Sequence, residues 1–237
     1  MLGTGNFDES REETRKRIWI EIGIVVCLAV IPYYAFLLVP LPAPNEIWKD
    51  SITRVAMALP ICAVVLYIMW RSEMAWPHFG LKQGFDATGI GVFVAALLCG
   101  LVLNPLMAAG FNMTWPLSPE AYEQINASFL RPVSVLDWCS LSVALLFSAA
   151  AEELAIRGFL TIRLNDLWYR KLLAVLVPAI VFGGYHYYQG FPSALAITIE
   201  GVIFGWMMLS TRRLVPLVLA HWVSNVYMFS AFPLPGT

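Results

Sequence analysis

Long apolar runs recur along the chain and are separated by short polar segments. A helix needs about 20 apolar residues to cross the hydrocarbon core of a bilayer. Runs of about that length predict seven membrane-spanning helices, at 18–39, 52–70, 88–110, 136–157, 172–188, 194–210 and 214–232. The pattern therefore predicts an all-α fold, a polytopic membrane helix bundle.

Two polar stretches define the expected domain organisation. Residues 1–17 are polar and charged, and the apolar run that follows is too long for a cleaved signal peptide, so we expect an N-terminal segment and an uncleaved anchor. Segment 118–131 predicts a short interfacial helix, with Ser118 as its N-cap and Pro119 in its first turn. Residues 18–237 show no internal repeat, so we expect them to form a single transmembrane domain.

The composition agrees with a membrane protein. Hydrophobic residues make up 59% of the 237 residues and charged residues 13%, with a net charge of −1. Soluble domains are about 45–50% apolar and about 25% charged, and a small soluble globule cannot hide such an excess of apolar surface. These values exclude a disordered chain, a coiled coil and a nucleic-acid-binding protein, and they favour the lipid bilayer as a partner.

The distribution of positive charge predicts the orientation. If the N-terminus is placed in the cytoplasm, twelve of the 15 Lys and Arg residues fall in or beside inner segments and three fall outside. Cytoplasmic loops carry an excess of Lys and Arg. We therefore expect a multi-pass protein with a cytoplasmic N-terminus.

Ionisable side chains gather in the last four apolar runs, whereas the earlier runs look like ordinary anchors. Each charge at a helix centre costs about 2.5–3.5 kcal/mol on insertion scales, so these groups must face one another or a wet cavity. Intramembrane ionisable residues are a functional hypothesis by default. The residues concerned are Glu152, Glu153, Arg157, His186, Glu200 and His221, together with the polar Asn225.

The spacing of these residues predicts which of them share a helix face. Glu153 and Arg157 are four residues apart and can pair, whereas Glu152 lies about 100° around the helix, away from that partner. His221 and Asn225 are also four apart. Small residues flank the clusters and let helix backbones approach closely, notably Gly183, Gly184, Gly201 and Gly205.

These residue types can perform peptide hydrolysis if their helices meet. A carboxylate and an imidazole can hold and deprotonate a water molecule. A second imidazole and a carboxamide can donate hydrogen bonds to a developing oxyanion. The sequence thus supplies a general base and an oxyanion stabiliser.

Three motifs occur in the order EExxxR (152–157), FxxxH (182–186) and HxxxN (221–225). This order resembles the CPBP (Abi-like) family of intramembrane proteases, which includes CAAX prenyl endopeptidases and bacteriocin-processing enzymes. The resemblance covers a catalytic core at about 140–230. Members of the family commonly have about eight membrane helices, so we expect seven to eight here.

The resemblance also implies a role for each motif residue. Glu152 would activate water together with His186, and His221 and Asn225 would stabilise the oxyanion. Glu153 and Arg157 would form a supporting ion pair. Glu200 is not part of the family pattern, and it could pair inside the bundle, shape the substrate cleft or take part in catalysis.

No cofactor is favoured by the residues, although a metal stays open. Asn is a poor zinc ligand and the sequence holds no HExxH motif, which favours a glutamate-type mechanism over a zinc metalloprotease. Two His and one Glu could still form an open zinc site.

The leading functional hypothesis is an endopeptidase that cleaves a membrane-associated protein or peptide near its C-terminus. Proton relays also place Glu and His in membranes, so a transporter or proton relay is an alternative. A non-catalytic immunity or scaffold member of the same family is another. The residues do not choose a substrate, whether prenylated or not, and they do not indicate an oligomeric state.

Overall fold

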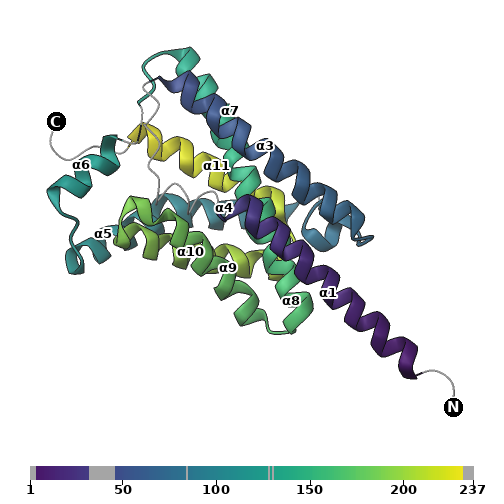
Figure 1. Cartoon of the computed structure of the whole chain (residues 1–237). Helices are drawn as coiled ribbons and strands as arrows, with labels where there is room; N and C mark the ends of the chain where they lie inside the picture. The colour runs from purple at the N-terminus through teal and green to yellow at the C-terminus, as the bar shows by residue number, and fades with distance from the viewer. Residues whose placement is uncertain (1–3, 32–45, 84, 128, 130, 232–237) are drawn as a thin grey trace.

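The computed structural model describes residues 4–31, 46–83, 85–127, 129 and 131–231, and every regular element in these residues is helical (Figure 1). The predicted all-α fold is confirmed. The α-helices are α1 (Thr4–Ala29), α3 (Ile47–Arg71), α4 (Ala87–Leu98), α5 (Asn104–Thr114), α6 (Pro119–Ala127), α7 (Val135–Glu153), α8 (Ile162–Trp168), α9 (Lys171–Tyr185), α10 (Phe191–Thr211) and α11 (Leu214–Ala231).

Short segments of different pitch join some of these helices. The π-helical segments Cys99–Leu103 and Leu154–Thr161 link α4 to α5 and α7 to α8 without a break. A 3₁₀ turn, His186–Gln189, follows α9, and another spans Trp76–Phe79. Because π-helical segments are often found at functional sites, the one directly after Glu153 marks the EExxxR motif.

Five helices of the described residues are long and apolar enough to cross a membrane. They are Ile47–Arg71, Ala87–Thr114, Val135–Trp168, Lys171–Gln189 and Phe191–Thr211, and they match five of the seven predicted spans. The apolar helix Leu214–Phe229 is shorter. The first predicted span, 18–39, falls partly on residues 32–45, outside the described residues. The total number of crossings therefore stays a prediction.

Two helices extend beyond their predicted membrane spans. The first helix begins at Thr4, so the charged start of the chain forms its first turns; Glu12 and Lys16 pair there across one turn at 2.7 Å. The span predicted at 136–157 continues to Trp168. Its polar extension is stable because Arg163 donates a hydrogen bond to Glu21 of α1 at 2.6 Å.

A helix forms within the segment predicted at 118–131, as α6 (Pro119–Ala127), and its place at the membrane interface stays a prediction. The Ser118 hydroxyl accepts a hydrogen bond from the backbone N–H of Ala121 at 3.2 Å, and Pro119 is the first helical residue. The predicted N-cap is therefore confirmed.

Small residues bring α9 and α10 together, as the glycine spacing predicts. A methyl group at Gly201 would lie 3.2 Å from Cβ of Ala179, and one at Gly205 would lie 3.1 Å from Cγ1 of Val175. Both glycines of the GxxxG pattern therefore face α9.

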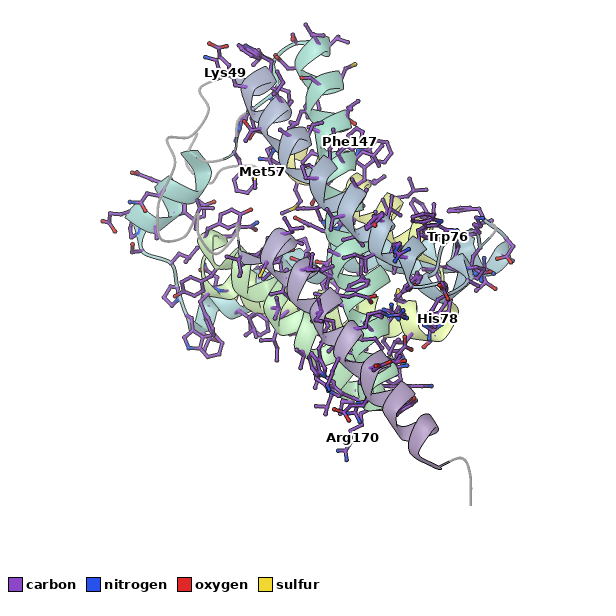
Figure 2. All side chains as sticks on the ribbon, turned by 45° about the vertical axis from the view of Figure 1, so that its right-hand side comes forward. Lys49, Met57, Trp76, His78, Phe147 and Arg170 are labelled. Atoms are coloured by element: carbon purple, nitrogen blue, oxygen red, sulfur yellow. The ribbon has the colours of Figure 1, made fainter. Side chains whose placement is uncertain are left out.

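The bundle has two distinct ends. Figure 2 shows Lys49 near one end of the molecule and Arg170 near the other. Helix α3 lies along α7 (Figure 1), and their N-terminal parts share the small cluster of Ile47, Leu141 and Leu145.

Candidate active site

The EExxxR motif forms a buried ion pair. Glu153 ends α7 and Arg157 lies in the π-helical segment that follows. Arg157 Nη1 donates a hydrogen bond to Glu153 Oε1 at 3.0 Å, and the two residues are 1% and 0% exposed. The pairing expected from their spacing is present.

Aromatic rings complete the environment of Arg157. Its guanidinium carbon lies 4.0 Å from the ring centroid of Phe182 on α9 and 5.6 Å from that of Phe204 on α10. A cation held over a ring face gains roughly 0.5–2 kcal/mol. Gly201 leaves room for the guanidinium, since a methyl group there would lie 3.4 Å from Arg157 Nη2.

His221 on α11 lies between the two glutamates of the first motif. Its Nδ1 is 2.9 Å from Glu153 Oε1 and its Nε2 is 3.5 Å from Glu152 Oε2. Glu153 Oε1 already accepts a hydrogen bond from Arg157, so we assign this carboxyl group as ionised and place a proton on His221 Nδ1. The other ring nitrogen of His221, Nε2, then faces the carboxyl group of Glu152.

His186 is held by the backbone of its own helix. It is the first residue after α9, and its Nδ1 lies 2.8 Å from the carbonyl oxygen of Phe182. Because a carbonyl can only accept, Nδ1 carries the hydrogen, and in the neutral ring Nε2 keeps a free lone pair. In this orientation Nε2 of His186 can accept a hydrogen bond or act as a base.

The ring of Phe182 joins the second motif to the third. Its centroid lies 4.7 Å from the ring of His186 and 6.2 Å from the ring of His221, the latter pair at 88°. Residues of all three motifs therefore lie around one phenylalanine.

Some expected partners are not in contact. In the part of the chain that the structure describes, no hydrogen bond or ion pair joins Glu152 to His186, because Glu152 lies beside His221 instead. Asn225 lies one turn beyond His221 on α11, half-buried, and it has no hydrogen-bond partner among the described side chains.

Glu200 of α10 has a partner that the sequence analysis missed. Asn104, at the start of α5, donates a hydrogen bond from its side-chain amide to Glu200 Oε2. A methyl group at Gly100 would collide with the hydroxyl of Ser224 and lie 3.2 Å from Glu200 Oε1. The signal that could have found Asn104 is a lone amide inside the apolar run 88–110, which we interpreted as an ordinary anchor.

The donor set as arranged does not fit a tetrahedral zinc ion. Zinc needs lone pairs from at least three protein ligands. Both nitrogens of His221 face carboxylates, and no group of three His, Cys, Asp or Glu side chains in the described ranges is placed to hold a metal. We therefore derive no step through a metal.

Comparison with known proteins agrees with the motifs. Residues 134–227 match a family model described as type II CAAX prenyl endopeptidase Rce1-like. The matched segment runs from the N-cap of α7 into α11 and contains all three motifs. No curated protein and no solved structure matches the chain. Over residues 134–227 the chain is therefore similar to CAAX-type membrane proteases, in agreement with the resemblance that the three motifs carry.

Proposed function

We propose that this integral membrane protein is an endopeptidase that hydrolyses a peptide bond near the C-terminus of a membrane-associated protein or peptide. The observation that carries the proposal is the convergence of three buried polar motifs around Phe182 and His221. Charged groups at this depth are costly, and their mutual arrangement supplies both a base and hydrogen-bond donors.

In this proposal Glu152 and His186 activate the attacking water. The free Nε2 of His186 accepts one hydrogen of the water, and Glu152, 11% exposed, accepts the proton that leaves as the oxygen attacks the carbonyl carbon. When the carbon–nitrogen bond breaks, the same proton passes from Glu152 to the leaving amine. A positioned general base contributes roughly 10²–10⁴-fold.

His221 and Asn225 are the proposed oxyanion donors. Glu153 fixes the His221 ring through Nδ1, while the 3.5 Å separation of Nε2 from Glu152 exceeds the length of a normal hydrogen bond. A protonated Nε2 can therefore donate to a substrate oxygen, together with the unpaired amide of Asn225. Loss of one such donor costs roughly 10²–10³-fold in rate.

The decisive experiment measures cleavage by purified variants in lipid nanodiscs. The substrates are membrane-bound peptides with a Cys-aliphatic-aliphatic-X C-terminus, with and without a prenyl group, and products are identified by mass spectrometry. Glu152→Gln and His186→Ala are each expected to lower the rate at least about 10²-fold.

Matched controls remove the same residue types away from the site. Glu13→Gln, on an exposed position of α1, and His78→Gln are expected to keep the wild-type rate. Equal melting temperatures of all four variants would show that each one folds. Wild-type cleavage by both site variants would overturn the assignment of the base.

Chelation tests the metal-free form of the proposal. We expect cleavage to survive treatment with a strong chelator, because the proposed steps use side chains alone. Loss of activity that added zinc restores would contradict this mechanism while leaving the protease assignment intact.

A further inference from the structure

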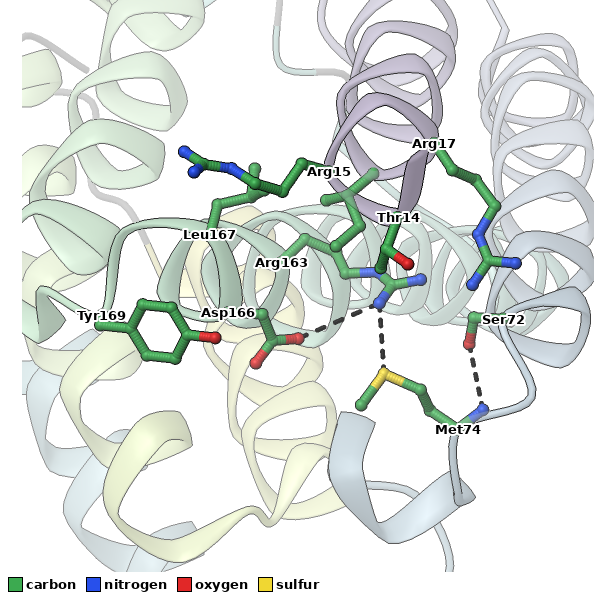
Figure 3. Close-up of a pocket in the computed structure, with 10 residues that line it drawn as sticks. Thr14, Arg15, Arg17, Ser72, Met74, Arg163, Asp166, Leu167 and Tyr169 are labelled. Carbon is green, nitrogen blue, oxygen red and sulfur yellow. Dashed lines mark hydrogen bonds and ion pairs between the residues drawn. The ribbon is translucent and has the colours of Figure 1, made fainter. Parts of the chain in front are cut away.

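A cavity of about 820 Å³ with both polar and apolar lining residues lies where α1, α8 and the end of α3 meet (Figure 3). Its polar lining includes Thr14, Arg15, Arg17, Ser72, Arg163 and Asp166. No residue of the three protease motifs lines it. The activity derived above therefore does not use this cavity.

Arg163 is the buried cation of the cavity. Its side chain is 3% exposed, and its two terminal nitrogens contact Glu21 Oε2 at 2.6 Å and Met74 Sδ at 3.2 Å. Its Nε is buried and has no hydrogen-bond partner among the described residues. Because arginine has five N–H donors, the protein leaves part of this guanidinium for another acceptor.

The charges around the cavity leave an excess of one positive charge. Arg15, Arg17 and Arg163 contribute three guanidinium groups, against the carboxylates of Glu21 and Asp166. Asp166 is also bound by the side chain of His78 at 3.0 Å.

Arg15 is the guanidinium that nothing neutralises, since it forms no ion pair within the described ranges. Arg17 is only loosely held, with its Nε 3.8 Å from Glu21 Oε1. A singly charged anion would balance the cavity. Planar guanidinium groups bind phosphate oxygens in pairs, so phosphate is the anion that this set of side chains favours.

The cavity lies at the level of a membrane surface. Two membrane-spanning helices end beside it, at Arg71 and at Trp168. Trp168 contacts Trp19 of α1 with ring centroids 6.3 Å apart, and Trp19 is 46% exposed. Tryptophan is enriched where hydrocarbon meets headgroups, so a ligand in this cavity is at headgroup depth.

We propose that this cavity binds the phosphate-bearing headgroup of an anionic phospholipid, held by Arg15, Arg17 and the buried Arg163. Basic pockets between membrane helices recognise such headgroups. The bound lipid also fastens α1 to the far end of the helix that carries Glu153 and Arg157, because Arg163 belongs to that continuous helix.

The test measures binding to the full-length purified protein by native mass spectrometry and by thermal shift in detergent. The probes are short-chain phosphatidylglycerol, short-chain phosphatidylcholine and inorganic phosphate. The wild type is expected to retain phosphatidylglycerol in preference to phosphatidylcholine and to melt at a higher temperature with it.

The double variant Arg15→Gln, Arg17→Gln keeps Arg163 and should weaken phosphatidylglycerol binding on the order of 30-fold, since each basic residue near a headgroup contributes about fivefold. Its matched control is Lys49→Gln, Arg131→Gln, which removes one charge at the opposite end (Figure 2) and one just before α7, and it is expected to bind like the wild type.

Each other outcome overturns the proposal. Equal binding of the two lipids would remove the anionic selectivity, and binding of phosphate without phosphatidylglycerol would assign the cavity to a free anion. Phosphatidylglycerol binding by the double variant at the wild-type level would show that the lipid does not bind in the cavity. An equal loss in the control would show that only the overall charge matters.

Discussion

The earlier half of the chain and the later half, which contains the matched residues 134–227, differ in how much of each membrane helix is buried by the rest of the protein. In the matched half, 50% of the apolar stretch of Val135–Trp168 is buried inside the protein, compared with 28% for Ile47–Arg71 and 22% for Ala87–Thr114. The half with high coverage holds the three motifs. Charged groups need protein partners in a bilayer, so the helices that carry them are the ones that must be enclosed.

The division is not complete, because a residue of the earlier half donates a hydrogen bond to a carboxyl group of the later half. Asn104 provides the hydrogen bond to Glu200, and Gly100 lets Ser224 of α11 approach closely. The earlier spans are therefore more than lipid anchors, and the difference between the halves can be tested residue by residue.

The largest expected effect comes from breaking the buried ion pair of the matched half. Arg157→Gln leaves the buried carboxylate of Glu153 without its cation, which costs about 3–5 kcal/mol. We expect a lower melting temperature in detergent and loss of cleavage. The control Arg71→Gln, at an exposed end of α3, should melt like the wild type. Equal melting of the two variants would contradict the structural role of the pair.

A methyl group added to one glycine in each half should have opposite effects on the free energy of unfolding. At Gly183 it would collide with the Thr198 hydroxyl and lie 2.6 Å from the backbone oxygen of Ala194, so Gly183→Ala should cost about 1–3 kcal/mol. At Gly91 nothing lies within 4 Å, so Gly91→Ala should stabilise α4 by up to about 1 kcal/mol. Unfolding in a denaturing detergent measures the stability of both variants. Changes in stability of the same sign would refute the contrast in packing.

The contact between the halves can be isolated with a double-mutant cycle. Asn104→Leu leaves the Glu200 carboxyl group without its amide donor and should cost about 1–3 kcal/mol, and Glu200→Leu is the second single change of the cycle. Replacing both residues by Leu should recover part of that loss, because no polar group is then left unsatisfied. Simple additivity of the two single changes would show that the pair is not coupled.

The smallest expected effect on stability concerns an ion pair at the surface between the two halves. Asp86 caps α4 by accepting the backbone N–H of Gly89 at 3.0 Å, and it pairs with Arg213, just before α11, at 2.7 Å. The Gly89 N–H, helped by Arg213, holds the pKa of Asp86 below its ordinary value.

Because the pKa of Asp86 is lower in the folded state, the stability that Asp86 contributes is fully present above its unfolded-state pKa. That stability is lost as the pH falls through its folded-state pKa. Asp86→Asn should therefore lower the melting temperature at pH 7 and flatten its decline in acid. A decline in acid as steep as that of the wild type would assign the pH dependence to other groups.

The sequence predicted the contact within the first motif correctly and the contacts between helices less well. Glu153 and Arg157 pair as expected because a spacing of four residues brings side chains together within one helix. Glu152 lies beside His221 rather than His186, and Asn104 was overlooked. Both of these contacts join helices that are far apart in the chain.

Hydropathy and local spacing were therefore enough to predict the helical class, five of the membrane helices and the family resemblance of residues 134–227, since each of these is a property of neighbouring residues. Which groups touch across helices was settled by packing. The contacts of His221 with two glutamates depend on how closely α7 and α11 approach, and the cavity beside Arg163 depends on where α1 lies against α8. No local pattern encodes those distances, because they follow from the fit of side chains over the whole bundle.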